Sequence, residues 1–177
     1  MAKERKKNYK KILIVGLIVL ALVGGSFLFF GQGLKKFVLP LVPELSTRGF
    51  IKVEVQVEKK DEGGLVSLIG DCYSLTANVE STQLESIENA LAKKIGPRPN
   101  AHDLMANIFS NLNINVLMVK VVGLRGKAYI GQLIIKQGDI ILNLDSRPSD
   151  GIAIALRINA PIYVNETLMK ENGEKIC

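Results

Sequence analysis

Residues 145–164, DSRPSDGIAIALRINAPIYV, carry the start, the body and the end of one helix and the strand that follows it. Pro148 suits the first position of a helix, where no backbone N–H is needed. Apolar residues continue to Asn159, a residue type that tolerates the left-handed conformation found at helix ends, and Pro161 prevents continuation. The segment therefore predicts a helix that begins at Pro148 and ends before Asn159, and a short strand over 162–164.

The chain before this helix shows the alternation of apolar and polar residues that is typical of strands. From Phe50 to Glu58 every second residue is apolar, which predicts a half-buried strand. Turn-bounded apolar runs predict further strands over 65–69, 72–79, 116–122, 128–135 and 140–144. The order of these elements predicts an α+β domain with three main helices and a mostly antiparallel sheet, which could close into a barrel.

Two helices are predicted between the strands. Thr82 and Glu85 have the spacing of a capping box, and Gly96-Pro97 would end that helix. The next helix begins near Asn100. Its expected buried face consists of Leu104, Ile108 and Leu112. A last helical turn is expected over 166–171.

The positive charge of the chain is concentrated at its N-terminus. The formal net charge is +6, but residues 1–36 hold eight basic residues and one acidic residue, which leaves fifteen and sixteen for the rest. The predicted domain is therefore close to neutral. It lacks the basic surface that most nucleic-acid-binding domains show.

Residues 12–34 contain no charged residue and are long enough to cross a bilayer as a helix. Six basic residues precede this stretch: Lys3, Arg5, Lys6, Lys7, Lys10 and Lys11. The positive-inside rule then predicts a cytoplasmic tail over 1–11, a single-pass transmembrane anchor over 12–34 and an extracytoplasmic domain. The lipid bilayer would be a partner of this chain.

The alternative is a cleaved signal peptide, with Gly31 and Gly33 at the cleavage site. We expect a juxtamembrane linker over 35–49, the domain over 50–171 and a tail over 172–177. Cys72 is expected to be a small core residue, and Cys177 to lie in the tail. A disulfide between them would require an oxidising compartment.

Two segments place an arginine just ahead of a helix N-terminus. Arg98-Pro99 precedes the helix near Asn100, and Arg147 precedes Pro148. Free backbone N–H groups and the helix dipole favour an anion there, and a guanidinium adds a bidentate partner for phosphate. Ser149 would add a hydroxyl group to the second site.

The candidate catalytic residues lie in the same two segments. His102 is the only histidine in the chain, and histidine commonly exchanges protons near neutral pH. Asp103, Asp145 and Asp150 could orient water or bind Mg²⁺ or Mn²⁺, with Asp145 as a metal ligand. The simpler interpretation is that Asp103 and Asp150 cap their helices and pair with the arginines.

The strings 97–104, PRPNAHDL, and 145–164 resemble the bifunctional nuclease (DNase/RNase) domain family. The resemblance covers most of residues 50–170. The family's RP-x-T-H-D motif has Ala101 in place of threonine here, and its D-x-RPSDA motif has Gly151 in place of the last alanine. The family's strand-to-helix motif is degraded at residues 75–80.

The resemblance implies a compact α+β fold and cleavage of phosphodiester bonds in RNA and DNA. On this hypothesis Arg98 and Arg147 hold the scissile phosphate, His102 transfers a proton, and Asp103 and Asp150 orient His102 or bind a metal. The alternative is a non-catalytic binding or assembly module in which the Arg and Asp residues form ion pairs inside the fold or at an oligomer contact. An extracytoplasmic position favours this alternative, unless the substrate is foreign or scavenged nucleic acid.

Overall fold

The alternating segment at Phe50 forms the strand that connects the two halves of the sheet. The computed structural model describes residues 43–177, and Thr47–Cys177 form one compact unit within it. The predicted cytoplasmic tail, the predicted anchor and residues 35–42 of the linker lie outside the described residues. Within 43–177 no helix has the length and apolar character needed to cross a membrane.

The sheet has eight strands in the order β6-β5-β4-β7-β1-β2-β3-β8. The bounds are β1 (Phe50–Lys59), β2 (Gly64–Gly70), β3 (Tyr73–Val79), β4 (Asn115–Arg125), β5 (Ala128–Gln137), β6 (Ile140–Ser146), β7 (Ile162–Asn165) and β8 (Glu174–Lys175). Every neighbouring pair is antiparallel except β4 and β7. The predicted mostly antiparallel sheet is confirmed, but it is open and does not close into a barrel.

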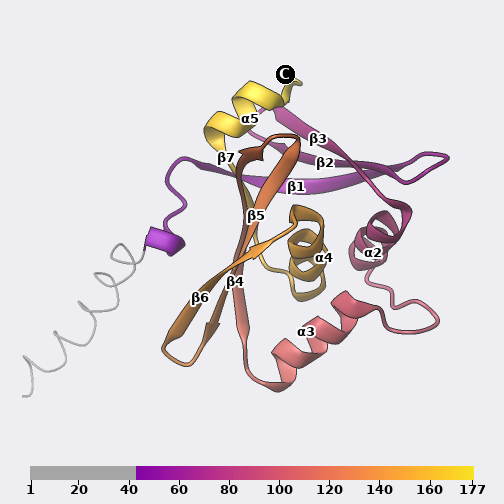
Figure 1. Cartoon of the computed structure of the whole chain (residues 1–177), viewed down its shortest axis with the longest axis vertical. Helices are drawn as coiled ribbons and strands as arrows, with labels where there is room; N and C mark the ends of the chain where they lie inside the picture. Colours follow the sequence, from indigo (N-terminus) through magenta and orange to yellow (C-terminus); the bar gives the residue numbers. More distant parts are fainter. Residues whose placement is uncertain (1–42) are drawn as a thin grey trace, which may run out of the picture. The chain divides into compact units, whose positions relative to one another are not determined.

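The two halves of the sheet meet at β1. Its first residues, Phe50–Val53, pair with β7, and Glu54–Lys59 pair with β2 on the other side. Figure 1 shows β1, β2 and β3 running across the long direction of β4 and β5. The sheet is therefore sharply bent, and its bend leaves room for a helix.

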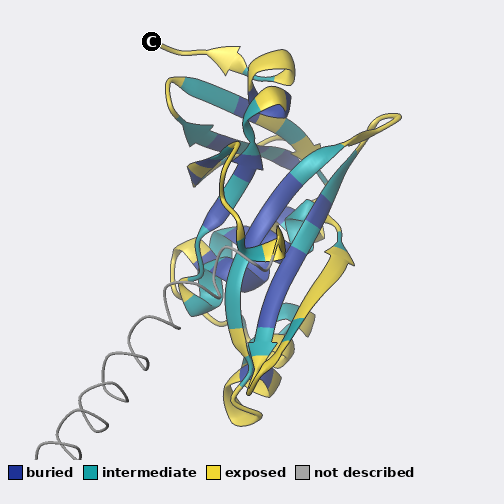
Figure 2. Cartoon of the chain, turned by 90° about the vertical axis from the view of Figure 1, so that its left-hand side faces the viewer, coloured by how far each residue is buried: buried dark blue, intermediate teal, exposed yellow. Residues whose placement is uncertain are grey.

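Helix α4 (Pro148–Ile158) occupies the angle between the two halves and packs against β4 and β5 (Figure 1). Three other α-helices are described: α2 (Ser81–Leu91), α3 (Ala101–Asn111) and α5 (Glu166–Asn172). Both α2 and α3 pack against α4. Figure 2 shows the buried residues along the middle of the long strands and exposed residues at the hairpin tips. The core includes Ile87, Val119, Val121, Ala153 and Val164.

The helix predicted from residues 145–164 has the bounds that the sequence indicates. Pro148 is its first residue, and Asn159 ends it in the left-handed conformation with φ 57°. The predicted start of α2 is wrong. Its N-cap is Glu80, without a side-chain cap, and the Ser81 hydroxyl instead accepts a hydrogen bond from the Gly63 amide at 3.1 Å. The helix also ends at Leu91, well before Gly96.

The predicted buried face of α3 is wrong as well. Leu104, Ile108 and Leu112 are 59%, 40% and 55% exposed, whereas Asp103 and Phe109 are buried. The polar contacts of the first turn decide this orientation, because they direct Asp103 inward. Residues one position later along the helix are rotated by about 100° and face outward.

The two cysteines form a disulfide, Cys72–Cys177, with a Cα–Cα distance of 5.1 Å. Cys72 is exposed in the tight turn between β2 and β3, so its expected core position is wrong. The expected tail is also more ordered than predicted, because β8 pairs with Tyr73 and Ser74 of β3. The bond thus fastens the C-terminal residues to the sheet.

Candidate active site

The N-termini of α3 and α4 meet at the candidate site. Asn100 caps α3, since its side-chain oxygen accepts hydrogen bonds from the amides of His102 at 2.9 Å and Asp103 at 3.0 Å. The Asp103 carboxylate accepts in turn from the Asn100 amide at 2.8 Å. The predicted capping role of Asp103 is confirmed, and this cap fixes the direction of the His102 side chain.

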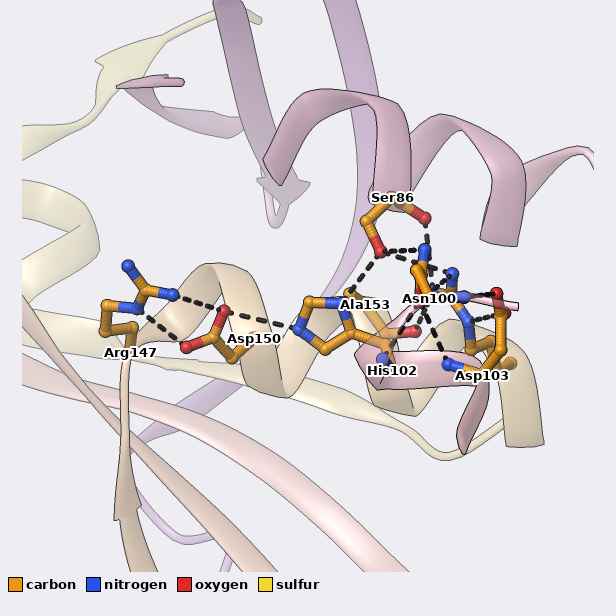
Figure 3. Close-up of polar contacts among 8 residues, drawn as sticks. Ser86, Asn100, His102, Asp103, Arg147, Asp150 and Ala153 are labelled. Atoms are coloured by element: carbon orange, nitrogen blue, oxygen red, sulfur yellow. Dashed lines mark hydrogen bonds and ion pairs between the residues drawn. The ribbon is translucent and has the colours of Figure 1, made fainter. Parts of the chain in front are cut away.

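His102 and Asp150 connect the two helices. The His102 Nε2 atom lies 3.3 Å from Asp150 Oδ1, and Arg147 donates to the same carboxylate through Nε at 2.7 Å and Nη2 at 3.0 Å. Figure 3 shows Arg147, Asp150 and His102 in one row of polar contacts. Their side chains are 67%, 27% and 20% exposed. The three groups are therefore paired and also reachable from solvent.

The charge of Asp150 stabilises the Arg147 cation. The hydrogen bond to Asp150, followed by its charge, raises the pKa of Arg147 above the ordinary value. This guanidinium stands just before α4, whose first-turn amides also favour negative charge. The position is suited to an anion with two oxygen atoms, such as a carboxylate or a phosphate.

The hydrogen bonds around Ser86 determine the tautomer of His102. The Ser86 hydroxyl oxygen accepts from Asn100 Nδ2 at 3.2 Å and from Arg157 Nη2 at 3.2 Å, which uses both of its lone pairs. Its hydrogen must therefore be donated to His102 Nδ1, which lies 2.8 Å away. The hydrogen of the imidazole is then on Nε2, directed at Asp150.

A second ion pair lies behind this site and is buried. Arg157 Nε donates to Asp103 Oδ1 at 2.6 Å, and each side chain is only 8% exposed. Burial by itself raises the pKa of Asp103, but the hydrogen bonds from Arg157 and from the Asn100 amide outweigh it and hold the pKa below the ordinary value. Asp103 therefore positions Asn100 and α3, and it does not face the solvent side of the site.

Comparison with known proteins identifies the family. The sequence model of the bifunctional nuclease domain matches residues 71–176, which is more than half of the chain. The chain belongs to the bifunctional nuclease domain family. All of the site residues described above lie within the matched region.

Two relatives show how similar this chain is to known proteins and how much of each chain the similarity covers. An uncharacterized protein of Mycobacterium tuberculosis is 35% identical over 77 residues, which is 44% of this chain and 45% of that protein. Bifunctional nuclease 1 of Oryza sativa subsp. japonica is 29% identical over 83 residues, which is 45% of this chain and 25% of that protein. The matched part thus spans less than half of either relative.

The side chains of three residues expected at the site make no hydrogen bond or ion pair with this cluster. Arg98 is exposed in the loop before Asn100 and makes no hydrogen bond or ion pair with any residue of 43–177. Ser149 lines an apolar hollow with Tyr129 and Ile152. Their assignment as substrate-binding residues stays a prediction.

The strand β6 holds the third of these residues, Asp145. Ser146 faces α4, because its hydroxyl is 3.4 Å from where a Cβ on Gly151 would stand. Side chains alternate along a strand, so Asp145 is on the opposite face, away from Asp103 and Asp150. Within residues 43–177 no group of three His, Cys, Asp or Glu residues is placed to hold a metal ion. The predicted carboxylate cluster is therefore not assembled.

Sequence reasoning missed Ser86 and Arg157. A signal for Arg157 was present, since it is the only charged residue in the apolar run Gly151–Ile158 and a buried arginine requires an acidic partner. Ser86 gave no such signal, because a serine on a helix is commonly exposed.

Proposed function

We propose that this chain is a nuclease that hydrolyses phosphodiester bonds in RNA and DNA at the junction of α3 and α4. The observation that carries the proposal is the exposed Arg147–Asp150 pair in contact with His102 at two adjoining helix N-termini. Family membership and the name of the rice relative support the same chemistry.

Arg147 binds the scissile phosphate in this proposal. An ion pair as exposed as Arg147–Asp150 contributes about 0–1 kcal/mol to stability, so a phosphate can replace the carboxylate at low cost. A phosphate offers the same bidentate acceptor geometry and gains the favourable field of the α4 N-terminus. The buried Arg157–Asp103 pair could not exchange partners in this way without leaving a buried charge alone.

Asp150 acts as the general base. Its carboxylate accepts a proton from the attacking water or hydroxyl, a new O–P bond forms, and the leaving oxygen departs from phosphorus and takes a proton from solvent. The Nε2–H group of His102 holds the Asp150 carboxylate in place during this step. Arg147 stabilises the negative charge on the phosphoryl oxygens.

Hydrolysis of labelled single-stranded RNA and DNA by the full chain tests the proposal, with and without added Mg²⁺ or Mn²⁺. Arg147→Gln is expected to raise KM and lower kcat, and His102→Ala is expected to lower kcat. Arg125→Gln, a change of the same kind at the exposed end of β4, should leave the rate unchanged. An inactive wild-type chain, or equal rates in all variants, would contradict the proposal.

The alternative is a non-catalytic binding module on the same scaffold, and the pairing of Arg147 with Asp150 favours it. A structural pair would be expected to be enclosed, whereas the Arg147 side chain is 67% exposed. This alternative predicts that the chain binds nucleic acid or protein and shows no hydrolysis in the same assay.

We further propose that the domain is extracytoplasmic and tethered by the apolar segment 12–34. The Cys72–Cys177 disulfide supports an oxidising compartment, since disulfides rarely persist in the cytosol. Foreign or scavenged nucleic acid is the substrate that fits this location. Labelling of Lys127 by a membrane-impermeant reagent in intact cells would support the location, and protection from it would contradict it.

A further inference from the structure

A cleft of about 290 Å³ lies between the C-terminal end of α2, the side of α3 that carries Asp103, Ala106 and Asn107, and the last turn of α4. Its volume is close to the lower end of the range of small-molecule sites, ~300–1,000 Å³. Lys93, Lys94 and Ile95 border it on one side and Asn107 on the other, with Arg157 and Asp103 at its base. None of the residues of the catalytic proposal lines this cleft.

The cleft carries a net positive charge, because its ion pair is neutral and two lysines remain. Arg157 and Asp103 neutralise each other. Lys93 Nζ donates to Leu156 O and Asn159 Oδ1, each at 2.7 Å, and both acceptors are neutral. The Lys94 backbone amide donates to Asn89 O at 2.9 Å, but its ammonium group is exposed and makes no hydrogen bond or ion pair with any residue of 43–177. The two lysine charges are therefore uncompensated.

The surrounding sequence strengthens this local charge. Residues 89–102, NALAKKIGPRPNAH, contain Lys93, Lys94 and Arg98 and no acidic residue. The nearest acid on α2, Glu88, is engaged with Lys59 at 3.0 Å. In a domain that is close to neutral, this segment is a local positive surface that leads to His102.

The cleft also offers neutral donors and an apolar wall. The side-chain amides of Asn89 and Asn107 line it and have no hydrogen-bond partner within the described part of the chain. Ile95 is 66% exposed at its edge. Ammonium groups, free amides and an exposed apolar side chain together fit a phosphate that carries a sugar and a base.

The position of the cleft relates it to the candidate active site. Asp150 and Arg157 are seven residues apart on one face of α4, a rise of about 10 Å at 1.5 Å per residue. Figure 3 shows the contacts running from Arg147 at one end to Asp103 at the other, and Asp103 is at the base of the cleft. The two sites are therefore close enough for one short stretch of a nucleic-acid strand to reach both.

We propose that this cleft binds a second phosphate of the nucleic-acid strand, a few nucleotides away from the bond at Arg147. Lys94 contacts that phosphate, Lys93 adds its charge, and Asn89 and Asn107 donate to the nucleotide. The inference rests on the proposed nuclease function, and it explains how a nearly neutral domain could hold a charged polymer.

The test is fluorescence anisotropy of a labelled thymidine octanucleotide with phosphorothioate linkages, which resist hydrolysis and keep the backbone charge. The full chain is compared with Lys94→Gln, Asn107→Leu and the control Lys127→Gln, which removes the same charge from the β4–β5 turn. Lys94→Gln is expected to weaken binding by about threefold to tenfold. It should also reduce the slope of log affinity against log salt by about 0.7. Asn107→Leu should weaken binding without changing that slope.

Equal affinity of Lys94→Gln and the wild-type chain would overturn the inference. Equal losses in Lys94→Gln and Lys127→Gln would overturn it too, because the effect would then be one of net charge. Hydrolysis of unmodified RNA is measured separately. Binding that depends on Lys94, without any hydrolysis, would support the cleft as a binding site and contradict the catalytic proposal. Hydrolysis with binding that does not depend on Lys94 would support the catalytic proposal and contradict the assignment of the cleft.

Discussion

Two arginine–aspartate pairs lie within one polar network, and their exposure separates their roles. Arg147 and Asp150 are partly open to solvent, whereas Arg157 and Asp103 are enclosed. A buried pair that loses one partner leaves a charge in the interior, so the inner pair holds the fold. The outer pair can exchange its partner for a substrate group.

In the Ser86→Ala variant, His102 is predicted to be no longer held in a single tautomer. Without the hydroxyl group nothing donates to Nδ1, so both tautomers become populated, and the loss of buried hydrogen bonds should cost about 1–3 kcal/mol of stability. Nitrogen-15 NMR of labelled histidine reads the tautomer directly, since His102 is the only histidine. Ser149→Ala is the control. A hydrogen on Nδ1 in the wild-type chain would refute the assignment.

Asp103→Asn is predicted to destabilise the chain at neutral pH by about 3–5 kcal/mol, because it leaves Arg157 buried without a counter-charge. The folded state holds the pKa of Asp103 below its reference value of 3.8, so the stability gained from it is complete above that pH. It is lost as the pH falls through the folded pKa. Urea unfolding should therefore show a smaller difference between variant and wild type near pH 3 than at pH 7, and an equal difference would contradict the account.

The outer part of the site could be predicted from the sequence, and the inner part could not. Arg147, Asp150 and His102 stand in two short segments with helix-start signals, which mark them locally. Ser86 and Arg157 acquire their roles only when three helices pack together. Asp103 was identified, but its direction depends on Arg157, 54 residues away.

At the level of elements, α3 shows that an apolar stripe need not be the buried face. Ile108→Gln is predicted to change the free energy of unfolding by less than about 0.5 kcal/mol, because Ile108 is exposed. Phe109→Ala, one residue later, should cost about 3–5 kcal/mol. Thermal or urea unfolding measures both. Similar costs for the two changes would show that the 104–108–112 face is buried after all.

The accuracy of the predictions made from the sequence differs between elements for a physical reason. The bounds of α4 were predictable because the residues that set them, Pro148, Asn159 and Pro161, lie at or next to the two ends of the helix. The start of α2 was not, because the Ser81 hydroxyl serves the distant Gly63. The open sheet and its bend at β1 depend on pairing between distant segments, which alternation alone does not specify.

For the whole molecule, the Cys72–Cys177 disulfide closes a loop across most of the domain. The bond joins residues 105 positions apart, so it should stabilise the chain by about 2–5 kcal/mol, mainly by restricting the unfolded state. The Cys72→Ser, Cys177→Ser double variant should therefore unfold at lower urea concentration. A reductant should lower the wild-type midpoint and leave that of the variant unchanged. Identical midpoints for the oxidised chain and the variant would contradict this prediction.

The rate of RNA hydrolysis by the full-length Asp150→Asn variant tests the account most directly. The substitution keeps the size of a partly exposed side chain and removes its charge and its capacity to accept a proton. It also replaces one of the two oxygen atoms that accept from Arg147 and His102 by an NH2 group. With unchanged stability, kcat should fall by about 10²-fold or more, the usual contribution of a general base. A rate within twofold of the wild-type rate would contradict the assignment of catalysis to the junction of α3 and α4.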